Sequence, residues 1–286
     1  MRHSRVVLGP VGVGVAGVGV GALLGLAGCS GAADDASAGG AKARPAASGA
    51  SADPADPADP GKTVREAVAA TRGTSSRLDQ KIELGDGTTT YRMSITGDFD
   101  MAADRGRLSV DLPGGAISHL DEIFVGDKVY LRGAEGLEGH WGSIDRDKAE
   151  AHAVLRAPLN DPEHVLVQVA AVKKVSDEGT AKVNGARTTH YRGMLDHATA
   201  TLRTEESLRA RFDEARESLG EDIPVFADAW VDGSGRVVRT RLTFSMAGVN
   251  VTTTMTFSDF GKPVKATAPP AADTVPATEV KGVLPG

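Results

Sequence analysis

The sequence has one cysteine, few aromatic residues, no excess of basic charge and no repeated long hydrophobic runs. A single cysteine excludes an internal disulfide framework and any metal site built from several cysteines. The formal net charge of −6 at pH 7 argues against a nucleic-acid-binding protein, which needs a basic surface to displace counterions from phosphates. Only residues 6–28 run uncharged over the ~20 residues that a spanning helix requires, which excludes a polytopic membrane protein.

The residue patterns of catalytic and metal sites are also missing. The six histidines beyond residue 28 show no i, i+2 or i, i+4 spacing and no H-E-x-x-H motif, so no metal site is expected. The run Ser118-His119-Leu120-Asp121 contains the residue types of a catalytic triad, but adjacent residues of a strand point to opposite faces. No G-x-S-x-G or S-x-x-K motif supplies a nucleophile. The sequence therefore predicts a protein that is not an enzyme and needs no cofactor.

The N-terminus is typical of an export signal. Arg2 and Arg5 precede the uncharged segment 6–28, in which apolar residues are followed by small ones. A transmembrane helix is the alternative, but eight glycines and Pro10 within this segment make it a poor permanent helix. We therefore interpret residues 1–28 as a signal peptide.

The end of this signal resembles the lipobox of bacterial lipoproteins. Leu26, Ala27 and Gly28 directly precede Cys29, the only cysteine of the chain. In such lipoproteins the cysteine thiol takes a diacylglyceryl group, and cleavage makes this cysteine the first residue. Two or more acyl chains anchor a protein stably to a bilayer. The resemblance implies a protein that is lipid-anchored through Cys29 to the extracytoplasmic face of the cell membrane.

The chain on either side of the central part is poor in large apolar residues. Residues 29–61 comprise the lipidated cysteine and a segment that is mostly Ala, Gly, Ser, Pro and Asp, which cannot bury enough apolar area to fold. We expect this segment to be a disordered tether, with an extended second half where proline recurs every third residue. Residues 269–286 are expected to form a flexible C-terminal tail. A folded domain of residues 62–268 lies between them.

This domain shows strands more clearly than helices. Apolar and polar residues alternate along 91–101, 107–112, 238–246 and 249–257, so each of these strands has one buried and one wet face. Short turns that contain glycine join such segments, which indicates hairpins and sequential antiparallel pairing. Long, one-sided strands in this order tend to curl. We predict an α+β fold with a strongly curved antiparallel sheet, an incomplete β-barrel, and helices over its concave side.

Helix signals occur at four places. Thr63 and Glu66 form a capping box for a helix to about residue 72, and Asp161-Pro162-Glu163 opens an apolar helix to about residue 172. A short helix is expected over residues 148–155. A fourth is expected over residues 205–219, with Gly220 as its end.

The chain resembles the actinobacterial LppX/LprG family of lipid-binding lipoproteins, which have the LolA-like fold. The resemblance rests on the lipobox, the tether, and the closing segments 226–239 and 256–264. It implies a half-barrel closed on one side by helices, with an apolar cavity that takes the acyl chains of lipids or glycolipids. The family includes no enzymes, so the resemblance implies no catalytic residue.

We expect from this a membrane-anchored lipoprotein that binds, and transfers, lipid acyl chains. The side chains that would line the cavity come from the apolar strand faces and from a candidate lid at residues 165–169. They are Met93, Ile95, Phe99, Leu108, Val110, Val165, Leu166, Val169, Phe244, Met255 and Phe257. The alternative is a scaffold or sensor domain of the cell envelope that binds a partner protein. The apolar faces fit a solid core as well as a hollow one.

Overall fold

The computed structural model describes residues 59–114 and 118–277. The predicted signal peptide, the lipobox with Cys29 and almost all of the predicted tether therefore lie outside the described residues. In the part of the chain that is described, no helix is long and apolar enough to cross a membrane.

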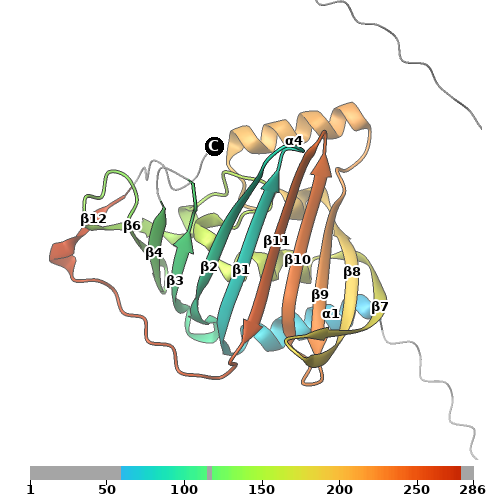
Figure 1. The fold of residues 1–286 in the computed structure, drawn as a ribbon, viewed down its shortest axis with the longest axis horizontal. Coiled ribbons are helices and arrows are strands. Elements are labelled where there is room, and N and C mark those ends of the chain that lie inside the picture. The colour runs from blue at the N-terminus through green and yellow to red at the C-terminus, as the bar shows by residue number, and fades with distance from the viewer. Residues whose placement is uncertain (1–58, 115–117, 278–286) are drawn as a thin grey trace, which may run out of the picture. The chain divides into compact units, whose positions relative to one another are not determined.

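One curved, unclosed sheet forms the framework of residues 59–277 (Figure 1). Its strand order is β12-β6-β5-β4-β3-β2-β1-β11-β10-β9-β8-β7. The strands are β1 (Ser75–Gly85), β2 (Thr90–Asp100), β3 (Arg105–Asp111), β4 (His119–Val125), β5 (Lys128–Arg132), β6 (Trp141–Asp145), β7 (Lys173–Val183), β8 (Ala186–Leu195), β9 (Val225–Asp232), β10 (Val237–Met246), β11 (Val249–Ser258) and β12 (Thr274–Pro276). All neighbours pair antiparallel except β12 and β6, which are parallel. The predicted fold class, α+β with a strongly curved antiparallel sheet, is confirmed.

The alternation read from the sequence decides which face of each strand is buried. In β11 the side chains of Val251, Thr253, Met255 and Phe257 are buried, and the residues between them are partly exposed. We call the face that carries these buried residues the inner face of the sheet. Most of the apolar core lies on this face, because the helices cover it.

Among the described residues, four α-helices accompany the sheet. They are α1 (Pro60–Arg72), α2 (Pro162–Ala170), α3 (His197–Ala200) and α4 (Glu206–Leu219). The start of α2 is as predicted, since the carboxylate of Asp161 accepts a hydrogen bond from the amide of Glu163. The start of α1 is not: the helix begins at Pro60 with Asp59 as its N-cap, three residues before the predicted capping box.

The helix predicted over residues 148–155 is wrong. This stretch holds only the end of a 3-10 turn (Arg146–Lys148) and then an irregular segment in which Ala151 forms an isolated β-bridge with Thr204. Alanine and glutamate favour a helix locally, but the pairing with a distant residue overrides that preference.

The predicted flexible tail contains ordered structure in its first part. Strand β12 pairs with β6 from Thr274 opposite Trp141 to Pro276 opposite Ser143, and the amide of Ala277 donates to the carbonyl of Ser143. The C-terminal segment therefore runs back from the centre of the sheet to its β6 edge (Figure 1). Residues 278–286 lie outside the described part.

Two glycines allow the curvature between β2 and β3. A Cβ atom added to Gly97 would lie 2.0 Å from the carbonyl oxygen of Arg107. A Cβ added to Gly106 would lie 2.2 Å from the ring of Phe99, which is the cross-strand partner of this glycine. Because neither strand has a side chain at these points, the backbones and the ring approach closely enough for the sheet to bend.

Candidate binding site inside the curved sheet

The predicted cavity-lining side chains come together in one apolar core on the inner face. Met93 is partly buried against this core, and all the others belong to it: Ile95, Phe99, Leu108, Val110, Val165, Leu166, Val169, Phe244, Met255 and Phe257. The sequence thus placed these residues on the correct face of their strands and helix. Their role in binding a ligand stays a prediction.

Helix α2, the predicted lid, lies deep in the domain. Val165, Leu166 and Val169 are all at most 1% exposed, and the helix packs against α1 and β9. Val167 on its far side is exposed, and Glu163 and Ala170 at its two ends are partly exposed. This helix therefore belongs to the fixed interior of the domain rather than to its periphery.

Helix α4 is held much more loosely than α2. Among its fourteen residues, all of them described, Phe212 is the one that is buried, and Leu208 and Ala215 are partly buried against the core. The ring of Phe212 contacts that of Phe244 on β10, with centroids 5.7 Å apart. Outside this contact, His197 pairs with Asp213 at 2.7 Å, and the carboxylate of Glu205 caps the helix. Phe212 is therefore the buried apolar side chain that fixes α4 against the sheet, with Leu208 and Ala215 partly buried beside it.

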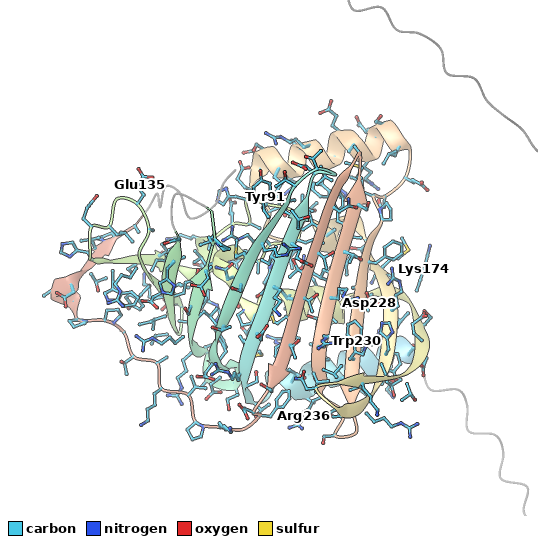
Figure 2. The ribbon with its side chains drawn as sticks, viewed as in Figure 1. Tyr91, Glu135, Lys174, Asp228, Trp230 and Arg236 are labelled. Atoms are coloured by element: carbon cyan, nitrogen blue, oxygen red, sulfur yellow. The ribbon has the colours of Figure 1, made fainter. Side chains whose placement is uncertain are left out.

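The inner face continues past the core as an exposed apolar lip. We use this name for Leu84 and Tyr91, which pair where β1 turns into β2, and for Met246 and Val249, which pair where β10 turns into β11. All four lie on the inner face of their strands, and Leu84, Tyr91 and Val249 are 42%, 60% and 38% exposed. Figures 1 and 2 show α4 running across this end of the sheet, beside the label of Tyr91.

The irregular segment 149–161 fills the space between the sheet and the helices. The carbonyl of Leu155 accepts a hydrogen bond of 2.9 Å from the hydroxyl of Thr253 on the inner face of β11. Leu155, Leu159 and Asn160 have φ angles of 56°, 49° and 52°, in the left-handed region that residues other than glycine rarely adopt. Tertiary contacts therefore hold this segment in a strained conformation.

A buried polar cluster joins this segment to β4. Glu122 is fully buried on the inner face, and its Oε1 accepts a hydrogen bond of 2.8 Å from Nδ2 of Asn160. Burial raises the pKa of Glu122 to about 8, although Asn160 and the charge of Arg156 act in the opposite direction. Burial also lowers the pKa of Arg156 to about 10. The alternating pattern Leu120, Glu122, Phe124 was the signal that could have revealed an acid on the inner face.

A second charged cluster, largely buried, lies beside α2. The guanidinium of Arg146 contacts the carboxylates of Asp161, Glu163 and Asp104 at 2.7, 2.9 and 2.8 Å. Burial opposes the charge of Arg146, but these three carboxylates raise its pKa. The arginine fastens the start of α2 to the loop after β2. His164, which lies next to this cluster, has its pKa lowered to about 4 by burial.

The interior is filled by the protein's own side chains. Beneath α4 the described residues enclose a cavity of about 10 Å³, lined by residues 153–156 and by side chains that include His164, Gln168, Leu208 and Phe212. This volume holds at most one water molecule. An open cleft of about 470 Å³ over the Arg146 cluster shares His164 with it. Within residues 59–114 and 118–277, no group of three or more His, Cys, Asp and Glu side chains could hold a metal ion.

Comparison with known proteins gives structural likeness at low identity. No family model and no curated protein matches the chain. Among solved structures, it is similar to LprF from Mycobacterium bovis (15% identity, 73% of this chain and 96% of that chain, TM-score 0.43). It is also similar to the lipoprotein LppX from Mycobacterium tuberculosis (14%, 72% and 97%, 0.44) and to the LolA superfamily protein NE2245 from Nitrosomonas europaea (8%, 74% and 96%, 0.31). The function therefore has to be argued from the residues of this chain.

Proposed function

We propose that this protein is a membrane-anchored extracytoplasmic lipoprotein that binds the acyl chains of lipids or glycolipids on the inner face of its sheet, and transfers them. One observation carries the proposal. The apolar inner face runs from the core to the exposed lip, and α4, which crosses this end of the sheet, has a single buried side chain. An exposed apolar surface that continues into a core marks an entry point for an apolar ligand.

The energies involved favour exchange between α4 and a lipid chain. Burial of Phe212 contributes about 1.5–3 kcal/mol, and each methylene of an acyl chain that leaves water contributes about 0.8 kcal/mol. Burial of roughly four methylenes therefore offsets the loss of the Phe212 contact. A long acyl chain has several times that number, so it can displace α4 from the inner face.

The irregular segment 149–161 supports the same interpretation. Three of its residues have left-handed φ angles, and two side-chain hydrogen bonds join it to the sheet, one from Thr253 and one to Glu122. Release of the segment from the sheet would break these two bonds and relieve the backbone strain. Movement of this segment together with α4 would leave an apolar concave surface in place of the filled interior.

The proposal is tested with the purified full chain by native mass spectrometry and by uptake of a fluorescent fatty acid. We expect co-purified lipid or saturable uptake, and faster uptake by Phe212→Ala. Leu219→Ala, on the exposed side of the same helix, is the matched control and should leave the rate unchanged. A bare mass with no uptake by any variant would contradict lipid binding and favour the alternative, a scaffold or sensor that binds a partner protein.

A further inference from the structure

Three polar side chains interrupt the inner face near its centre. Gln80 on β1, Thr240 on β10 and Thr253 on β11 are each at most 2% exposed. The hydroxyl of Thr253 donates to the carbonyl of Leu155. In contrast, Nε2 of Gln80 and Oγ1 of Thr240 have no hydrogen-bond partner among the residues that the structure describes.

Strand register places these groups around one residue. Met255 pairs with Gln80 on one side and with Thr240 on the other, and Thr253 is the next residue along β11 on the same face. The backbones of Gln80 and Thr240 are two strands apart, roughly 10 Å by the usual strand spacing. Met255 is one of the predicted cavity-lining residues, so both unpartnered donors point to the side where the acyl chains would lie.

Buried donors without partners need a physical explanation. Each costs free energy comparable to a lost hydrogen bond, and valine would fill the place of Thr240 with the same shape at no such cost. Neither Gln80 nor Thr240 lines the 10 Å³ cavity or the open cleft over Arg146.

The neighbouring threonine indicates what kind of partner fits. Thr253 already holds a carbonyl oxygen, and that oxygen belongs to Leu155, whose φ angle of 56° is left-handed. A carbonyl group is thus accommodated on this part of the inner face. The cross-strand neighbours of the two donors, Met255, Ile95 and Ala229, are uncharged, which suits an uncharged acceptor better than a carboxylate or a phosphate.

We propose that Gln80 and Thr240 donate hydrogen bonds to carbonyl oxygens of the bound lipid. This inference rests on the proposed lipid-binding function and adds specificity to it. The site selects acyl esters, with the ester group buried at the centre of the sheet, over chains of the same length that have no carbonyl group.

The test compares two lipids that differ only in the carbonyl groups, dihexadecanoylglycerol and its ether analogue dihexadecylglycerol. Each is used to displace a fluorescent fatty acid from the purified full chain. We expect the ester to bind about tenfold more tightly for each hydrogen bond formed. Thr240→Val and Gln80→Met should each reduce this preference, leave the affinity for the ether unchanged, and leave the thermal midpoint unchanged or raise it.

Thr253→Val is the matched control, because its hydroxyl already has a partner within the protein. Thr253→Val should therefore lower the thermal midpoint, and this fall is the reference for the loss of a structural hydrogen bond. Equal binding of ester and ether by the wild type would overturn the role of Gln80 and Thr240 and leave lipid binding intact. Binding of neither lipid, nor of the fatty acid, would overturn lipid binding itself. A fall in thermal midpoint for Thr240→Val as large as for Thr253→Val would also refute the inference, since it would show a structural hydrogen bond.

Discussion

Truncation of Phe212 should release α4 without unfolding the sheet. The side chain is 8% exposed, and its burial contributes about 1.5–3 kcal/mol, of which alanine retains only a small part. The ring pair with Phe244 adds about 0.5–1.5 kcal/mol. Phe212→Ala should therefore weaken the docking of α4 by about 2–4 kcal/mol. Each 1.4 kcal/mol is a factor of ten, so the open population should rise by roughly 30- to 1,000-fold.

Hydrogen exchange followed by mass spectrometry resolves this effect by element. Amides of α4 should exchange faster in Phe212→Ala by about that factor, whereas those of β10 and β11 should keep most of their protection, because local opening does not require global unfolding. Leu219→Ala on the same helix should exchange like the wild type. If α4 and the strands lose protection equally, α4 belongs to the cooperative core and the reasoning about a loosely held helix fails.

Three further predictions concern the anchor and the two charged clusters. Cys29→Ser should leave the protein unprocessed or release it from membranes; mature, membrane-bound mutant protein in a fractionation experiment would refute the lipobox. Glu122 has a pKa of about 8 when folded and an ordinary value of 4.5, so the folded state keeps a proton that the unfolded state loses. Raising the pH from 5 to 8 should therefore lower the free energy of unfolding of the wild type relative to that of Glu122→Gln, by up to roughly 1.4 kcal/mol per pH unit. Urea denaturation measures both free energies, and a difference between them that does not change with pH would contradict this prediction. Arg146→Met should lower the free energy of unfolding by about 3–5 kcal/mol, because it leaves buried Asp161 without its cation. Arg132→Met removes an exposed ion pair and should lower it by less than about 1 kcal/mol. Equal losses in the two variants would show that the Arg146 cluster stabilises the fold no more than a surface ion pair does.

The strands could be predicted because their signal is local. The period-two pattern of β2, β10 and β11 is visible in any window of ten residues, and it placed Ile95, Phe244 and Met255 on the inner face. The start of α2 was also local, since Asp161 and the following proline form the cap by themselves. Such features depend on neighbours in sequence, and distant contacts did not alter them.

The covering of the inner face could not be predicted in the same way. Residues 148–155 have the composition of a helix, yet they follow an irregular path because Ala151 pairs with Thr204 and Thr253 holds the carbonyl of Leu155. Likewise, the stripe of apolar residues on α4 does not show that Phe212 alone becomes buried. The sequence shows that Gln80 is a polar residue on the same face of its strand as Leu78 and Ile82. It does not show that Nε2 of Gln80 lacks a hydrogen-bond partner, because that depends on how the whole interior packs.

The position of β1 beside β11 affects how the chain can fold. Gly85 pairs with Asn250, 165 residues further along, and this seam joins β1–β6 to β7–β11 at the centre of the sheet. During synthesis from the N-terminus, the edge of β1 stays unpaired until the last long strand has been made. Closing so large a loop is slow, because its entropy is lost before the contacts form, and an unpaired edge is open to association in the meantime. We therefore expect formation of the β1–β11 seam to limit the folding rate, and the first half of the chain on its own to aggregate.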